Sequence, residues 1–123
     1  MSKNGGTAFV TQFNAALAKQ QAGDFAGAEA GYRKAMALNP NVALLYNNLG
    51  VALHSQRRNE EAVAVQKKAI ALDPTMAMAY NNMGVAYNAL GRHEEAIPAF
   101  TKADRKEHTS ELQSRGLISY AVF

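Results

Sequence analysis

Apolar residues recur three or four positions apart along most of the chain, which is the spacing of one face of an α-helix. Short breaks that carry Gly, Asn or Pro separate these stretches. Pro40 and Pro74 mark two of the breaks, because the residue before a proline is pushed out of the helical region. The pattern predicts six helices, over about residues 9–22, 24–38, 42–56, 60–72, 75–90 and 94 onward.

The middle of this pattern recurs with a period of 34 residues. A fixed period of this size indicates stacked repeats, in which each unit buries its apolar face only against its neighbours. We therefore predict an all-α array of antiparallel helix pairs, with its function on the surface of the stack rather than in one pocket. Five identical pairs carry the period: Tyr46 and Tyr80, Asn47 and Asn81, Asn48 and Asn82, Gly50 and Gly84, and Ala62 and Ala96.

The helix pairs resemble the tetratricopeptide repeat family over residues 9–103. The resemblance rests on an aromatic residue and a Leu-Gly pair in the first helix, small residues in the second helix, and a closing proline. The third unit has most of these features and the first has fewer, with Ala15 and Ala16 in place of Leu-Gly. In the second unit the residues are Tyr46, Leu49, Gly50, Ala62, Ala69 and Pro74.

This resemblance implies a right-handed superhelix of about three units. We expect the units at residues 9–42, 43–76 and 77–103, the third incomplete, after a flexible lead-in over residues 1–8. Two departures should weaken the array. Gln66 occupies the site of Tyr32 and Phe100 in the other units. Gly27 and Gly31 lie inside one predicted helix, where each costs about 0.5–1 kcal/mol relative to Ala.

The repeat pattern stops after Ala103, and His108 stands where a closing proline is due. Residues 104–114 and 118–123 resemble two constant blocks of a translated sequencing adapter, in the right order. We therefore expect residues 104–123 to be a non-native tail and the sixth native helix to be interrupted near Ala103. Recovery of the same codons from genomic DNA would overturn this expectation.

Composition excludes several classes of protein. The chain has no cysteine, so disulfides and thiolate metal sites are ruled out. It has no apolar run long enough to span a membrane and no secretory signal at its start, so a cytoplasmic location is the default. The net charge of +3 comes from separated basic pairs such as Arg57-Arg58, close to acidic residues. Such pairs are typical of solvated helix faces rather than of a nucleic-acid interface.

Candidate chemistry is sparse. His54, His93 and His108 lack the spacing of metal ligands, and no phosphate loop or nucleophile elbow is present. We therefore expect no enzyme, no metal and no cofactor.

The resemblance implies that the first helix of each unit lines a concave face, where relatives bind their ligands. Asn14, Asn48 and Asn82 lie one per unit on this face. An Asn amide can donate to a peptide carbonyl and accept from a peptide N–H, so such a ladder suits an extended peptide. The other interpretation is that these amides bond a neighbouring helix. The predicted peptide-binding residues are Asn14, Asn47, Asn48, Val51, His54, Met78, Asn81, Asn82, Val85 and Asn88.

The sequence thus predicts a non-catalytic scaffold that binds an extended peptide or a partner protein in its concave groove. The carboxylate clamp of the co-chaperone subtype is disfavoured, because its cationic sites correspond to Phe13, Met78 and Asn82. The alternative is the substrate-selecting region of a larger enzyme similar to O-linked N-acetylglucosamine transferases. A third interpretation is self-association through the C-terminal repeat, because an uncapped repeat exposes apolar surface.

Overall fold

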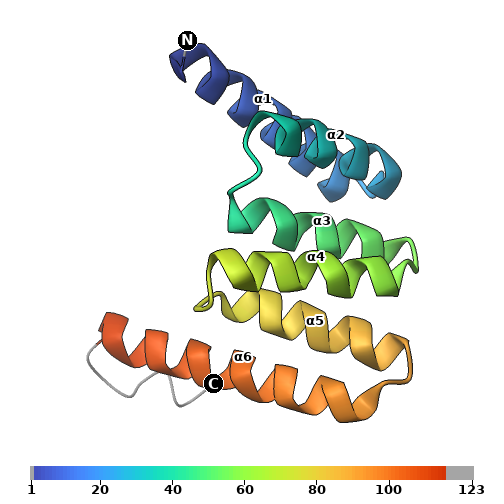
Figure 1. Ribbon diagram of the computed structural model, residues 1–123, viewed down its shortest axis with the longest axis vertical. Helices are drawn as coiled ribbons and strands as arrows, with labels where there is room; N and C mark the ends of the chain where they lie inside the picture. The colour runs from blue at the N-terminus through green and yellow to red at the C-terminus, as the bar shows by residue number, and fades with distance from the viewer. Residues whose placement is uncertain (1, 116–123) are drawn as a thin grey trace.

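The computed structural model describes residues 2–115, and the side chains of residues 6–105. Figure 1 shows the helices stacked one after another from α1 to α6. The most extensive contacts join α1 to α2, α3 to α4, and α5 to α6. This arrangement confirms the predicted all-α array of helix pairs. The helices are α1 (Ser2–Gln21), α2 (Phe25–Leu38), α3 (Ala43–Ser55), α4 (Asn59–Leu72), α5 (Ala77–Ala89) and α6 (His93–Arg115).

The first and the last helix both extend further than the sequence pattern predicts. Helix α1 begins at Ser2, so residues 2–8 are helical where a flexible lead-in is expected. Glycines at positions 5 and 6 weaken a helix without ending it, and no proline interrupts this stretch. Helix α6 continues to Arg115, past Ala103, where the repeat pattern stops. A non-native tail stays a prediction, since residues 104–114 contain no helix breaker and residues 118–123 lie outside the described part of the chain.

A residue in the left-handed conformation ends the first helix of each unit. Gly23 and Gly91 have φ angles of 86° and 79°, and Arg57 has 64° at the equivalent site. The next residue then donates its N–H to the carbonyl five residues back, as Arg58 does to Leu53 at 2.9 Å. This bond closes the helix in the manner of a Schellman motif. The predicted breaks after residues 22 and 90 are therefore confirmed and lie at Gly23 and Gly91, and Arg57 adopts the same turn without a glycine.

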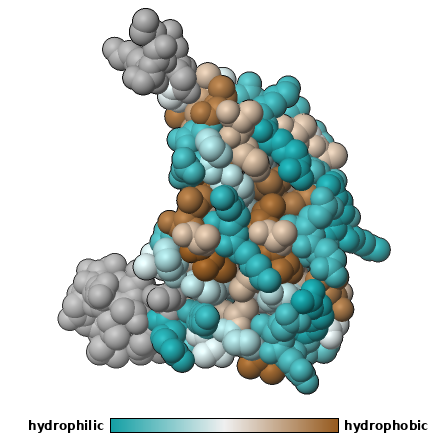
Figure 2. All heavy atoms as spheres, viewed as in Figure 1, coloured by the Kyte–Doolittle hydropathy of each residue, from teal (hydrophilic) through white to brown (hydrophobic). Residues whose placement is uncertain are grey.

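The core lies between the helices and combines small with large residues. Tyr32, Leu45, Leu49 and Leu53 are fully buried, and alanines at the helix crossings let the backbones approach closely. On the face seen in Figure 2, apolar patches are broken up by hydrophilic side chains.

The C-terminal unit leaves one apolar site uncovered. Ile97 is 66% exposed, whereas Val63 at the equivalent site of the preceding unit is 5% exposed. Self-association through this unit stays a prediction, which sedimentation at increasing protein concentration would test.

Ion pairs join the first unit to the second on the outer surface. Arg58 contacts Glu29 at 2.6 Å, and Glu29 also accepts hydrogen bonds from Gln56 and Arg33. Burial raises the pKa of Glu29, but these hydrogen bonds outweigh burial, so the pKa is held below its ordinary value. Glu29 is therefore ionised and paired across the neutral pH range.

This pairing predicts a pH-dependent contribution to stability. Because the pKa of Glu29 is lower in the folded state, its contribution is complete above the unfolded pKa of about 4.3 and is lost as pH falls through the folded value. We expect wild type to lose stability relative to Glu29→Gln between about pH 6 and about pH 3. The difference should stay below about 1 kcal/mol, because Arg58 is 38% exposed. Urea denaturation at each pH would measure it, and parallel profiles would contradict it.

Candidate functional site

The predicted binding residues differ in accessibility. Asn47 is buried, at 2% exposed. Five are half-buried: Asn48, Val51, His54, Asn82 and Val85. Four are exposed: Asn14, Met78, Asn81 and Asn88.

Four of these residues, from two different units, meet at one pocket. Val51 and His54 come from α3, and Asn82 and Val85 come from α5. Gly50 completes the lining, and the cavity volume is about 40 Å³. The repeat geometry thus brings the same faces of α3 and α5 together around a small recess. Gly50 is not among the predicted residues, although its place beside Val51 and its lack of a side chain are visible in the sequence.

A line of side-chain hydrogen bonds crosses the units beside this pocket. Asn82 Nδ2 donates to Asn47 Oδ1 at 2.9 Å, and Asn47 Nδ2 donates to Asn48 Oδ1 at 3.4 Å. Asn48 bonds the Tyr32 oxygen, and the Tyr32 hydroxyl donates to Gln20 Oε1 at 2.5 Å. The amides at Asn47, Asn48 and Asn82 therefore bond neighbouring helices, the interpretation left open by the sequence. Peptide binding by these residues stays a prediction.

Tyr32 anchors this line from α2. Burial raises the pKa of Tyr32 to about 12, and the hydrogen bond from Asn48 acts in the opposite direction. The hydroxyl is therefore protonated at neutral pH and donates to Gln20. The predicted site omits both Tyr32 and Gln20. In the sequence Tyr32 occupies a packing site, and nothing there indicates that its hydroxyl takes part in a set of side-chain hydrogen bonds.

The second and third units share one side-chain contact, in which histidine and asparagine have exchanged places. His54 Nδ1 bonds Asn59 Oδ1, and one unit later His93 Nδ1 bonds Asn88 Oδ1 at 2.8 Å. Each pair joins the end of the first helix to the start of the second. His54 and Asn88 therefore help to close the turn of their units, and His54 also lines the pocket.

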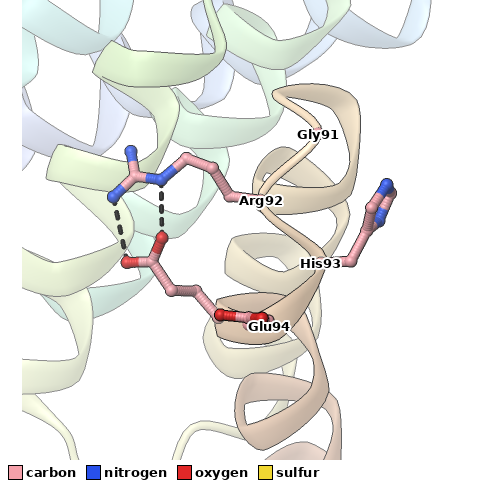
Figure 3. Close-up of a pocket in the computed structure, with 5 residues that line it drawn as sticks. Gly91, Arg92, His93 and Glu94 are labelled. Carbon is pink, nitrogen blue, oxygen red and sulfur yellow. Dashed lines mark hydrogen bonds and ion pairs between the residues drawn. The ribbon is translucent and has the colours of Figure 1, made fainter.

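A larger recess, of about 570 Å³, lies at the turn between α5 and α6, over residues 91–95 (Figure 3). Its charged groups are used within the turn, because Arg92 donates to both oxygens of Glu95 at 2.6 and 2.9 Å. Figure 3 shows His93 pointing away from Arg92. All its lining residues are consecutive, so it brings no separate elements together.

The described residues offer neither a metal site nor a membrane-spanning helix. No cluster of three or more His, Cys, Asp or Glu side chains there could hold a metal ion. None of the helices in this part of the chain combines the length and hydropathy that a membrane crossing requires.

Comparison with protein families identifies the class. One tetratricopeptide repeat profile matches residues 13–77, and a second matches residues 77–103. The chain belongs to the tetratricopeptide repeat family. Such repeats are in general non-catalytic modules for protein interaction. A comparison with curated protein sequences finds no match.

Solved structures share this architecture. The crystal structure of MamA is 27% identical with a TM-score of 0.79, and the match covers 84% of this chain and 60% of MamA. The Arabidopsis OM64 TPR domain is 25% identical with a TM-score of 0.82, covering 84% of this chain and 85% of that domain. The second TPR of Spaghetti (RPAP3), solved with the HSP90 peptide SRMEEVD, is 25% identical with a TM-score of 0.75, covering 77% and 88%. The chain thus spans about three fifths of the length of MamA.

Proposed function

We propose that the chain binds an extended peptide, or an extended segment of a partner protein, along the face formed by α1, α3 and α5. One observation carries the proposal: residues from two units, chosen from the repeat pattern alone, line a single recess. The amide line beside the recess supports it, because the line fixes the positions of Asn48 and Asn82. A fixed surface of amides and aliphatic groups loses little conformational entropy when a peptide binds.

The related structures favour a protein ligand over other classes. The TPR of Spaghetti (RPAP3) is solved with a bound peptide, and its fold matches this chain over most of both lengths. The alternative, a substrate-selecting region of a glycosyltransferase-like enzyme, would use the same face and would differ only in what is bound. Transfer of a sugar from a nucleotide-sugar donor to a protein acceptor by an intact longer protein would favour that alternative.

A charge placed in the recess should weaken peptide binding. We expect Val51→Asp to lower affinity at least about tenfold, because a bound peptide would leave the new carboxylate desolvated without a cation. Fluorescence anisotropy with labelled peptides, selected on the wild-type chain from a random displayed library, would measure the loss. Leu38→Asp, on α2 and 47% exposed, is the matched control and should bind as wild type does. Equal affinity of Val51→Asp and wild type would contradict the proposal.

A further inference from the structure

On the basis of the peptide-binding function proposed above, we propose that the groove takes an uncharged stretch of extended peptide. This peptide inserts a small aliphatic side chain, alanine or valine, between Val51 and Val85. A backbone N–H of the same peptide donates to the side-chain oxygen of Asn82, Oδ1.

The size of the recess sets the size of the side chain. Its volume is about 40 Å³, and Val51 and Val85 provide aliphatic walls from α3 and α5. A water-sized group takes up about 10–15 Å³ of such a cavity, so the space accepts about three methyl-sized groups. A leucine or aromatic side chain exceeds this volume. Alanine and valine therefore fit, and larger side chains require the walls to move.

The side chain of Asn82 at the recess selects for a donor. Asn82 Nδ2 donates to Asn47. The side-chain oxygen of Asn82, Oδ1, is on the other side of the amide and therefore faces away from Asn47. Asn82 Oδ1 is thus left as an acceptor beside the aliphatic walls of the recess. A backbone N–H satisfies this acceptor, whereas a carboxylate oxygen would meet a second acceptor.

The residues that line the recess include no lysine or arginine to bind a carboxylate. The ten predicted binding residues include no Lys, Arg, Asp or Glu. The guanidinium groups of Arg58 and Arg92 are paired away from the recess, Arg58 with Glu29 and Glu61, and Arg92 with Glu95. Binding should therefore depend little on salt, and the peptide terminus should not matter.

The test begins with a positional-scanning library of heptapeptides, acetylated and amidated at their ends, offered to the full chain. We expect selection of Ala or Val at one position and no selection of Asp or Glu. Affinity of the selected peptide should change less than about twofold between about 0.05 and 0.5 M NaCl. The acidic peptide SRMEEVD, seen in the Spaghetti (RPAP3) structure, should not bind.

A change of pocket size then tests the contact itself. Val85→Ala should lower the affinity for the wild-type peptide about tenfold, through lost aliphatic contact, and should move the selected residue from Ala or Val to Leu or Ile. A general loss of stability would not move this preference. Leu38→Ala, outside the groove on α2, removes a similar side chain and should leave both affinity and preference unchanged.

The outcomes separate the two proposals. Selection of acidic peptides, strong salt dependence, or an unchanged preference in Val85→Ala would overturn the inference while leaving a peptide-binding function. If no library member binds the wild-type chain, the binding function itself fails and the inference fails with it.

Discussion

Replacing Gly31 with leucine should lower the free energy of unfolding by about 2 kcal/mol, among the largest effects expected of a single change in this chain. A Cβ atom at Gly31 would lie 2.7 Å from the Ala16 Cβ and 3.2 Å from the Ala16 Cα. These atoms belong to a short side chain and to the backbone of α1, so neither can move without displacing the helix. Overpacking of this kind costs about 1–3 kcal/mol and sometimes more, which exceeds the gain of about 0.5–1 kcal/mol in helix propensity.

Urea denaturation followed by far-UV circular dichroism would measure this loss. Gly27→Leu is the matched control, because it lies on the same helix and gains the same propensity. A Cβ at Gly27 would meet only the Asp24 carboxylate, the end of a side chain that can turn away. Its displacement costs at most an N-cap, about 1 kcal/mol. Similar losses in the two variants would show that the contact with Ala16 does not limit the packing of α1 on α2.

The two glycines show what the sequence could and could not predict. The pattern predicts the helix that contains them, and the structure confirms it over Phe25–Leu38. From propensity alone, both glycines appear only as a cost. How closely α1 approaches α2 depends on Ala16, the residue that faces Gly31, and the sequence does not show that these two residues face each other. The reason for a glycine at position 31 is therefore visible only once the two helices are packed together.

Asn47 and Asn81 make the same point for the candidate site. They are the same residue at the same site of consecutive units, yet Asn47 is 2% exposed and Asn81 is exposed. Helix α5 covers α3 and brings Asn82 to Asn47, whereas no described helix covers α5 in the same way. The repeat period predicts which residues are equivalent. Their burial depends on the next unit, so the two amides cannot have equal roles in binding.

The second and third units also differ in the side chain that packs against the glycine of their first helix. In the third unit the Phe100 ring lies where a Cβ at Gly84 would be. In the second unit Gln66 occupies the equivalent place against Gly50. Gln66 is 1% exposed, and its Nε2 donates to the Asn47 carbonyl at 3.0 Å. Its Oε1 is buried without a hydrogen-bond partner among the described residues. A buried acceptor of this kind costs about 1–3 kcal/mol.

Gln66→Phe should therefore raise the free energy of unfolding by about 2 kcal/mol. The variant removes the unsatisfied Oε1 and buries an aromatic ring, which together outweigh the loss of one hydrogen bond of about 1 kcal/mol to Asn47. The absence of a Cβ at Gly50 leaves the ring the same close approach that Phe100 has to Gly84. Gln66→Ala is the control, because it loses the same hydrogen bond and gains no ring, and a cavity should make it less stable than wild type. Thermal and urea denaturation would rank the three proteins. A Gln66→Phe variant less stable than wild type would mean that the second unit cannot accept the ring without moving α4 away from α3.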